Sequence, residues 1–469
     1  MTRVIYRGLL ASLAYVFLLD GYVRLRTGSS SLTLLRDVLP GGVALLGLAV
    51  LCVRHTKLQR GPLFGLVATF AAVAFVEVLN PDTVSIKLGL EALRQHLEFV
   101  PIFFIAFAVM RSEARLRGLA LLMVVAAAAN GIVGVIQSQL TLDQFAGLGT
   151  GYRTLITEST VPGAVHNARV FFDATGHRTL RPPALGGDFG FGGVLGMCAL
   201  PFALALILAP SRRAHRWAGI LALPLTAAAV VSSQTRAAVI AAVAAIVAFL
   251  WFAARERTLI VPAVVTVGLG VVVVALSGIN LGRYDSITPT QVGSTFGAQR
   301  GGSFDLIPTY AAKYPLGAGL GTAGPAARLH SSVNTGKLSG ENAFTFLTLE
   351  LGIPGLVCGF ALFAIALRRG ARLARSRSLG SARLYLAAVS ASLVGCSVLW
   401  FAGGVTAAPP GAPFVWLAFG VVAAWSLGPR PPATSRVMHG APERPVDRRS
   451  GARASPPGER PVDGRPAET

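Results

Sequence analysis

An acidic residue and an amide stand at the entrance of a long apolar stretch, in the sequence SGENAFTFLTLELGIPG at Ser339–Gly355. Glu341 offers a carboxylate that can take a proton from a hydroxyl group, and Asn342 beside it offers an amide. Both residues also suit the first turn of a helix, because acids and amides satisfy free backbone N–H groups there. Glu350 lies deeper in the stretch, where an ionisable group indicates a function or a buried partner.

Arginines suited to binding phosphate precede this stretch. Arg236 lies in the short sequence SSQTRAAV between two apolar runs, and Arg300 precedes a glycine-rich run that includes Gly317–Gly324. A guanidinium group binds phosphate oxygens through two parallel hydrogen bonds, and glycines allow the backbone to approach a partner closely. The structural alternatives are an interface anchor for Arg236 and a simple tight turn for the glycines.

Apolar helices must position these residues. The chain has 469 residues, of which 53% are hydrophobic and only 13% charged, whereas a soluble protein carries about 25% charged residues. The chain contains repeated apolar runs whose lengths are close to the roughly 20 residues that a helix needs to cross a bilayer. In lipid such spans must be helical. We therefore predict an all-α polytopic membrane protein with about twelve transmembrane helices, at 6–22, 38–53, 62–79, 97–110, 118–138, 185–208, 218–233, 237–253, 259–277, 343–367, 384–401 and 413–428.

The basic residues predict the orientation. Nineteen Lys and Arg residues fall at the N-terminus and in the short loops of one side, so both termini are predicted in the cytoplasm. This topology, with no basic face that interleaves aromatic residues, explains the net charge of +21 without nucleic acid. Two long outer loops follow, Thr141–Pro182 and Gly278–Glu341, and loops of that length are usually functional or disordered.

The chain divides into three predicted regions. Residues 1–180 hold the N-terminal membrane helices and the first outer loop, and residues 181–428 hold the remaining helices and the large outer loop. Residues 429–469 are polar and rich in Pro and Arg, which predicts a disordered cytoplasmic tail. The four cysteines lie far apart in apolar runs, so neither a disulfide nor a metal site is expected.

Three motifs, in this order on a polytopic chain, resemble the O-antigen ligase and Wzy polymerase superfamily. Ser233–Arg236 is similar to that family's Ser-Arg turn between two spans. Arg300 with Tyr314–Gly321 resembles its Arg followed by a PLxGxGxG loop, and Asn342–Gly355 resembles its [His/Asp]-Asn-x9-Gly-x-x-Gly signature. The resemblance covers about residues 181–401.

The resemblance implies a metal-independent glycosyltransferase of GT-C-like fold in the cytoplasmic (inner) membrane. Such an enzyme takes a glycan from an undecaprenyl-diphosphate carrier on the outer face and transfers it to, or polymerises it on, a glycan or other acceptor. It implies that Arg236, Arg300 and Arg181, the last ahead of a Gly-rich helix entry, bind the diphosphate. No cofactor is expected, and no two acidic residues lie two positions apart, so the chain has no DxD metal clamp.

The general base is a point of departure from the family. Its ligases carry His where this chain has Glu341, and a partly buried carboxylate can take over that role. Glu341 and the adjacent Asn342 are therefore predicted in the catalytic site, with His330 as a second candidate base and His166 and His177 as weaker ones. The acid favours polymerase-like members, and ligase and polymerase both stay open.

A lipid-linked glycan flippase or another membrane transporter is the alternative from a different class. Transporters often place ionisable residues at mid-membrane within inverted repeats. Here only Glu350, Asn130 and Glu77 are polar residues of note within the apolar runs, and the two halves show no repeat. A non-catalytic scaffold is the third possibility, and it would tolerate the loss of the arginines.

Overall fold

The computed structural model describes most of the membrane region of the chain. The described residues are 2–29, 38–43, 45–47, 49, 61–83, 85–160, 170–172, 178–253, 284, 302–323, 342–403 and 408–428. All of them belong to one compact unit, Met1–Pro429. The span predicted at 259–277 and the tail predicted at 429–469 lie outside the described residues.

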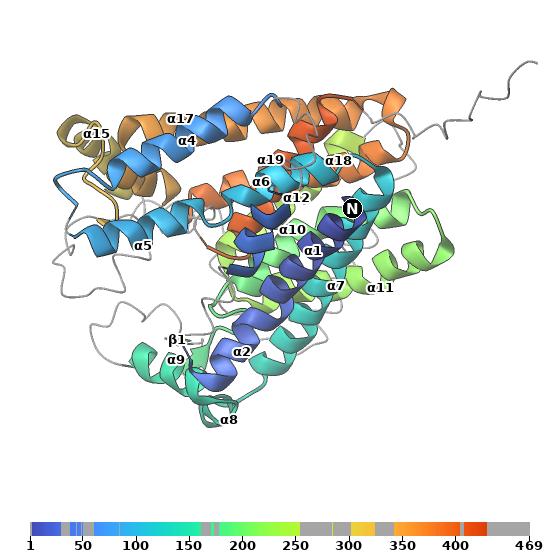
Figure 1. Ribbon diagram of the computed structural model, residues 1–469. Coiled ribbons are helices and arrows are strands. Elements are labelled where there is room, and N and C mark those ends of the chain that lie inside the picture. Colours follow the sequence, from blue (N-terminus) through green and yellow to red (C-terminus); the bar gives the residue numbers. More distant parts are fainter. Residues whose placement is uncertain are drawn as a thin grey trace, which may run out of the picture. The chain divides into compact units, whose positions relative to one another are not determined.

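Helices make up most of the described chain (Figure 1). The helices are α1 (Thr2–Ala14), the π-helix η1 (Tyr15–Leu19), α2 (Asp20–Thr27), α4 (Phe64–Glu77), α5 (Ile86–Leu97), α6 (Val100–Val109), α7 (Glu113–Ser138), α8 (Leu142–Gly147), α9 (Thr150–Thr160), α10 (Phe191–Leu208), α11 (Arg213–Ser232), α12 (Arg236–Ala253), α15 (Gly302–Lys313), α17 (Ala343–Arg375), the 3-10 helix η5 (Arg377–Leu379), α18 (Ala382–Trp400) and α19 (Gly411–Trp425).

Eight helical segments within the described residues are long and apolar enough to cross a membrane. They are Thr2–Thr27, Ile86–Val109, Glu113–Ser138, Phe191–Leu208, Arg213–Ser232, Arg236–Ala253, Ala343–Arg375 and Ala382–Trp400. Shorter apolar helices cover Val38–Gly47, Phe64–Glu77 and Gly411–Trp425. The prediction of a helical, multi-pass membrane protein is thereby confirmed.

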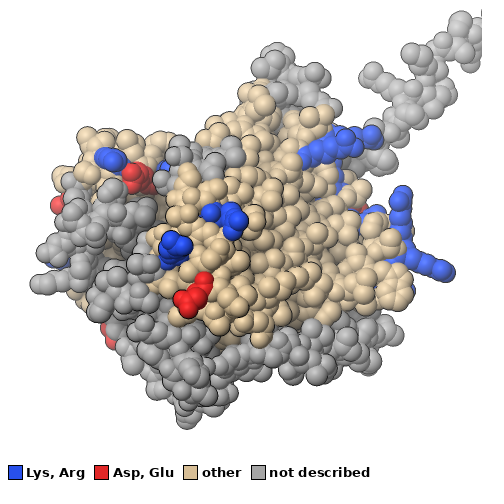
Figure 2. All heavy atoms as spheres, turned by 90° about the horizontal axis from the view of Figure 1, so that it is seen from below, with Lys and Arg blue, Asp and Glu red and all other residues tan. Residues whose placement is uncertain are grey.

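The surface of the described helices suits contact with lipid. Large apolar side chains such as Leu221, Val243, Val247 and Trp251 are exposed on α11 and α12. Figure 2 shows a face on which most described side chains are uncharged, with Lys and Arg confined to a few separate groups. Exposed apolar surface of this extent is unfavourable in water and favourable in a bilayer.

One predicted span starts too late in the chain. The run predicted at 97–110 belongs to a longer segment, α5 and α6, that begins at Ile86. The Ser85 hydroxyl caps α5 by accepting from the Leu88 backbone N–H at 3.2 Å. Helix α5 was missed because its polar residues lower the mean hydropathy of the segment. A polar side chain lowers that mean even where it is buried against a partner in the fold.

The first long outer loop has structure of its own. It contains α8, α9 and two short strands, β1 (Val170–Phe172) and β2 (Arg178–Leu180), which pair antiparallel with Val170 opposite Leu180. This ribbon is an exception to the all-helical prediction. Leu25 of α2, Phe145 of α8 and Tyr152 of α9 form a small core there, and burial raises the pKa of Tyr152 to about 12.

Helix α10 lies at the centre of the described bundle. It packs against α7, α11, α12 and α18, and nearly all of its residues are buried. Helix α17 runs beside α4 and α18, and α15 packs on its first half (Figure 1). Helix α19 is almost fully buried against α6 and α17.

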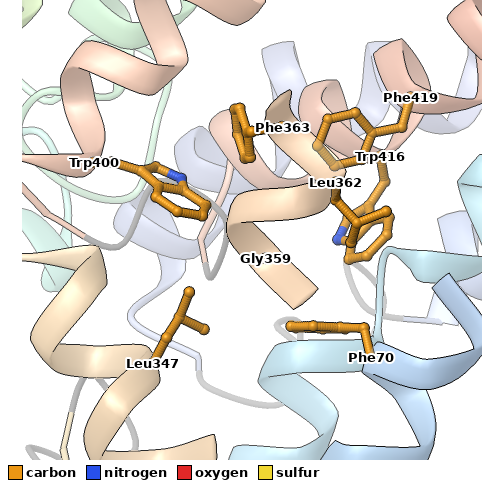
Figure 3. Close-up of a pocket in the computed structure, with 8 residues that line it drawn as sticks. All are labelled: Phe70, Leu347, Gly359, Leu362, Phe363, Trp400, Trp416 and Phe419. Atoms are coloured by element: carbon orange, nitrogen blue, oxygen red, sulfur yellow. The ribbon is translucent and has the colours of Figure 1, made fainter. Parts of the chain in front are cut away.

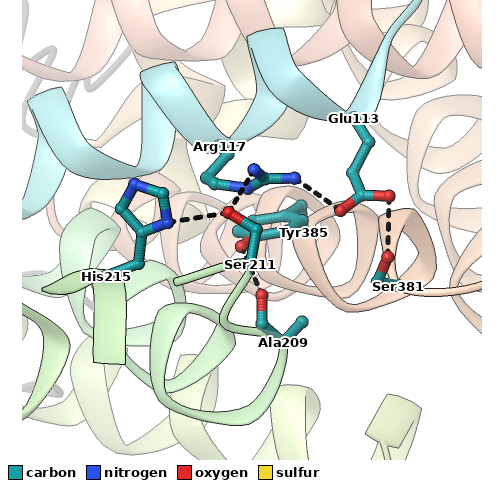
Figure 4. A network of polar contacts seen from close by, with 7 residues as sticks. All are labelled: Glu113, Arg117, Ala209, Ser211, His215, Ser381 and Tyr385. Atoms are coloured by element: carbon teal, nitrogen blue, oxygen red, sulfur yellow. Dashed lines mark hydrogen bonds and ion pairs between the residues drawn. The ribbon is translucent and has the colours of Figure 1, made fainter. Parts of the chain in front are cut away.

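One end of the bundle is fastened by a polar network, and we call it the network end (Figure 4). The Glu113 carboxylate, in the first turn of α7, pairs with Arg117 at 2.7 Å and accepts from the Ser381 hydroxyl at 2.7 Å. Arg117 also donates to Ser211, whose hydroxyl lies 2.9 Å from His215 Nδ1. The network therefore joins the starts of α7, α11 and α18.

Replacing Glu113 with alanine is expected to lower stability by about 1 kcal/mol, because the Ser381 bond and a partly exposed ion pair are lost. Asp143→Ala is the matched control, since Asp143 also lies in the first turn of a helix, is exposed and forms no such bridge to another helix of the described chain. The measurement is the fraction of protein that stays monodisperse in detergent after heating. Equal heat resistance of the two variants would contradict a fastening role for Glu113.

Candidate functional site

The end opposite to the network end carries all three candidate residues that lie within the described chain, and we call it the arginine end. Helices α7, α10 and α11 each reach the network at one terminus, so their other termini lie here. Trp400 ends α18 here, and its ring lies 5.5 Å from that of Phe344 at the start of α17. Arg181, Arg236 and Asn342 thus share one end. The predicted residues outside the described chain are Glu341, Arg300, His330, His166 and His177.

The segment Arg181–Gly190, which leads into α10, is held by two buried amides of α7. Gln137 bonds to both backbone groups of Ala184, donating to its O at 3.0 Å and accepting from its N–H at 2.8 Å. Asn130 accepts from the Leu185 N–H at 3.1 Å and donates to the Phe17 carbonyl at 3.0 Å. Both side chains are buried in the apolar core, so the amides fix the path of this segment.

The turn that carries Arg236 lies against the same segment. Ser232 ends α11 and Arg236 begins α12, so only three residues separate the two helices. Gln234 in this turn is buried and has a positive φ of 53°. A Cβ added at Gly190 would lie 3.2 Å from Thr235 Oγ1. The starts of α10 and α12 therefore adjoin each other, and each presents a positive dipole end.

Arg181 lies on the segment that leads into this pair of helix starts. Its guanidinium carbon lies 4.9 Å from the centre of the Phe189 ring, which precedes Gly190. Its Nε is buried and donates no hydrogen bond within the described part of the chain. The aromatic ring thus fixes the place of the guanidinium, whose Nε is a buried donor without a partner among the described residues.

Arg24 is a third arginine at this place, and sequence reasoning missed it. A Cβ added at Gly187 would overlap the Arg24 guanidinium, so the two are in direct contact. Arg24 follows the first span on the predicted outer side, where the charge rule disfavours basic residues. A basic residue on the predicted outer side was the reason for selecting Arg236, and the same reasoning could have identified Arg24.

Asn342 is the N-cap of α17. Its side-chain oxygen accepts from the Thr345 backbone N–H at 2.9 Å, and the side chain is 0% exposed. The capping interpretation of Asn342 is therefore confirmed. The cap fixes the point at which the chain enters the helix, one residue after Glu341, and the predicted place of Asn342 in the catalytic site stays a prediction.

Residues Pro315–Ala323, which we call the glycine loop, dock on a kink in α17. Gly352 interrupts the helix with φ 63° and ψ −166°. The kink frees backbone groups that the loop binds: Ala318 N–H donates to the Leu349 carbonyl at 2.7 Å, and Ile353 N–H donates to the Pro315 carbonyl at 2.9 Å. The two sequence motifs that contain these residues thus meet in the fold.

Glu350 has the buried partner that its position predicted. Its Oε2 lies 2.7 Å from Nε2 of His96 in α5, and its Oε1 accepts from the N–H groups of Gly321 and Ala323 at 3.1 and 3.3 Å. Sequence reasoning missed His96, because it placed that residue just before a span. Leu88, Ala92 and His96 recur at four-residue steps on the buried face of α5, and this spacing could have revealed it.

A second buried carboxylate touches the glycine loop from α4. Asn80 Nδ2 donates to Glu77 Oε2 at 2.8 Å and to the Gly317 carbonyl at 3.0 Å. Glu77 is buried at the end of the helix. Within the described residues, no three His, Cys, Asp or Glu side chains gather into a group that could hold a metal ion.

An apolar pocket lies beside the buried pair of Glu350 and His96, between α4, α17, α18 and α19 (Figure 3). It is lined by Phe70, Leu347, Gly359, Leu362, Phe363, Trp400, Trp416 and Phe419. The Phe70 ring also lies 6.3 Å from the His96 ring, edge to face. The lining has no charged group, so the pocket offers no partner for a diphosphate.

A cationic group also stands near the glycine loop. Lys313 ends α15, and its ammonium lies 5.0 Å from the centre of the Tyr314 ring. A hydrogen bond to Tyr314 raises the pKa of Lys313, so the side chain is charged at neutral pH. The described arginine end therefore combines cations, adjoining helix starts and a docked glycine loop, an arrangement that can bind a polyanion.

A scan of the sequence against protein-family models gave no match, and a search of curated proteins gave none either.

Proposed function

We propose that this protein is a membrane glycosyltransferase that resembles O-antigen ligases and polymerases. It transfers or polymerises a glycan carried on undecaprenyl diphosphate, at the outer face of the cytoplasmic membrane. The proposal includes the finer topology: about twelve spans in a GT-C-like arrangement, both termini in the cytoplasm, and the arginine end facing outward.

The observation that carries this proposal is the position of Arg181 and Arg236. Arg181 lies on the segment that leads into α10, with its guanidinium carbon 4.9 Å from the Phe189 ring, and Arg236 begins α12, whose preceding residue Thr235 adjoins Gly190. Two cationic residues and two positive helix ends therefore lie on adjoining segments. A diphosphate carries the charge and the oxygens that such a set binds. Arg24 adds a third guanidinium at Gly187.

The proposed reaction needs a base and a stabilised leaving group. An acceptor hydroxyl attacks the anomeric carbon of the carried sugar while the bond from that carbon to the diphosphate oxygen breaks. The electron pair leaves with the diphosphate, where Arg181, Arg236 and Arg300 would balance the charge. The proton passes to Glu341, which directly precedes the buried cap Asn342.

A flippase or transporter is the second candidate, and one observation favours it. Glu350, His96 and Glu77 are ionisable residues buried within apolar helices. Intramembrane groups of this kind occur in proton relays and substrate pathways. This candidate would use the same end of the bundle to bind a lipid-linked glycan, but it would make no new glycosidic bond.

The deciding experiment uses the full chain in proteoliposomes with a fluorescent oligosaccharide on undecaprenyl diphosphate. A glycosyltransferase releases carrier diphosphate and yields a longer or transferred glycan, which chromatography separates from the donor. A flippase changes only the leaflet in which the intact donor lies, as a membrane-impermeant glycosidase reports. Intact donor after incubation with a range of acceptors would refute the enzymatic proposal.

A further inference from the structure

We propose that Glu350 and His96 are positioning residues, which hold the glycine loop on α17 for the reaction at the arginine end. This inference rests on the proposed function. His96 lies outside the three sequence motifs of the family. Glu350 lies within one of them, but between its fixed positions.

Every acceptor atom of the Glu350 side chain is used. One oxygen receives the His96 contact at 2.7 Å, and the other receives the N–H groups of Gly321 and Ala323. The side chain is 0% exposed. The loss of these partners would leave a buried carboxylate without compensation, which is strongly destabilising. The loop and α5 are therefore both held to α17 through this one group.

The same contacts fix a larger part of the arginine end. The glycine loop is also tied to α17 by the Ala318 and Ile353 backbone bonds, and to α4 by Asn80. Helix α15 runs directly into the loop, and its Tyr310 packs with Phe346 and Leu349 of α17. The loop, α15 and the first turns of α17 therefore form one unit whose place depends on Glu350.

The surroundings of His96 argue for positioning and against contact with substrate. Its ring stacks on Phe346 with centroids 5.1 Å apart and planes 17° apart, and the residue is 5% exposed. An acceptor sugar has no room to bring a hydroxyl group to this imidazole. The pair therefore acts on the reaction through the backbone that it holds.

A glutamine at position 350 separates positioning from proton transfer. In Glu350→Gln the amide oxygen still accepts from Gly321 and Ala323, and the amide NH2 donates to His96 Nε2, which accepts when the imidazole carries its proton on Nδ1. The three hydrogen bonds persist, but the side chain no longer takes up a proton. Glu350→Ala removes the bonds to the loop, and His96→Phe keeps the ring stacking while removing the partner of Oε2.

The experiment measures amide hydrogen exchange by mass spectrometry and transfer kinetics on full-length protein in nanodiscs. In Glu350→Ala and His96→Phe, we expect exchange at Ala318, Gly321 and Ala323 to speed up about tenfold or more. We expect kcat to fall about tenfold or more, with KM for the lipid-linked glycan changed less than about threefold, because misplacement affects the reacting geometry. Glu350→Gln should keep both properties close to wild type.

Thr226→Ala is the control. Thr226 is equally buried, and its hydroxyl donates to the Ala222 carbonyl one turn earlier in the same helix, α11, so exchange in the loop and kcat should stay at wild-type values. Unchanged exchange in Glu350→Ala would overturn the inference. So would a Glu350→Gln protein that keeps its protected loop but is as inactive as Glu350→Ala, because the pair would then move a proton.

The two readouts fail separately. If the wild-type protein transfers no glycan, the proposed function fails, and with it the link to catalysis. The exchange rates still test whether Glu350 holds the glycine loop. If the wild-type protein is active and exchange does not respond to Glu350→Ala, the positioning role alone is refuted.

Discussion

Replacing Arg236 with alanine is expected to lower the rate of glycan transfer about 100-fold or more, while the protein inserts and folds normally. Arg236 is the first residue of α12, beside the start of α10, and its guanidinium would stabilise the charge that develops on the departing diphosphate. Removal of one preorganised donor to a developing oxyanion typically costs about 10²–10³ in kcat. The measurement is the initial rate of product formation in proteoliposomes at saturating donor.

Two further variants sharpen the Arg236 experiment. Arg236→Lys keeps the charge but loses the two-pronged geometry, so its activity should fall between alanine and wild type. Arg213→Ala is the matched control: Arg213 is also the first residue of a helix, but it is exposed and lies at the network end. Activity of Arg236→Ala within threefold of Arg213→Ala would remove Arg236 from the mechanism.

The long apolar helices could be predicted from the sequence because an apolar residue in them is favourable whether it faces lipid or another helix. Helix α10 shows this well, since its run Phe191–Leu208 is apolar on all sides and almost wholly buried. The predicted start at 185 was early, because the residues up to Gly190 form a series of turns and bends held by Asn130 and Gln137. Such long-range amide contacts leave no periodic pattern.

Helix α5 could not be read correctly from hydropathy. Its polar residues lower the average over the window, although His96 is buried against Glu350, which lies 254 positions away in the chain. His96 can be buried only because Glu350 is there to pair with it, and Glu350 likewise depends on His96. The kink at Gly352 likewise depends on the glycine loop, which supplies the donor and acceptor groups that the interrupted helix lacks.

The candidate site was predicted in part. The glycine loop and the turn at Arg236 were recognised from composition and spacing, and the structure places the first on α17 and the second beside Gly190. The prediction that Glu341 is the base stays a prediction. Arg24 was missed because a basic residue just beyond a span has a common and simple explanation as an anchor at the membrane surface.

Replacing Gly352 with alanine is expected to release the glycine loop and abolish activity. The backbone at Gly352 has φ 63° and ψ −166°, a conformation that costs a residue with a Cβ about 1–3 kcal/mol. A Cβ there would also lie 2.3 Å from the Leu316 carbonyl carbon and 2.6 Å from Gly317 N. These are backbone atoms, so the loop itself must move, and the bonds of Ala318 and Ile353 are lost with it.

The matched control for this substitution is Gly380→Ala. Gly380 has a similar backbone conformation, φ 54° and ψ −135°, and nothing lies within 4 Å of an added Cβ. Both variants carry the conformational cost of about 1–3 kcal/mol, and only Gly352→Ala adds the collision. We expect Gly380→Ala to lose a little heat resistance while keeping activity and slow exchange at Ala318, whereas Gly352→Ala loses both. If the two variants behaved alike, the docking of the glycine loop on the kink would not be what the reaction needs.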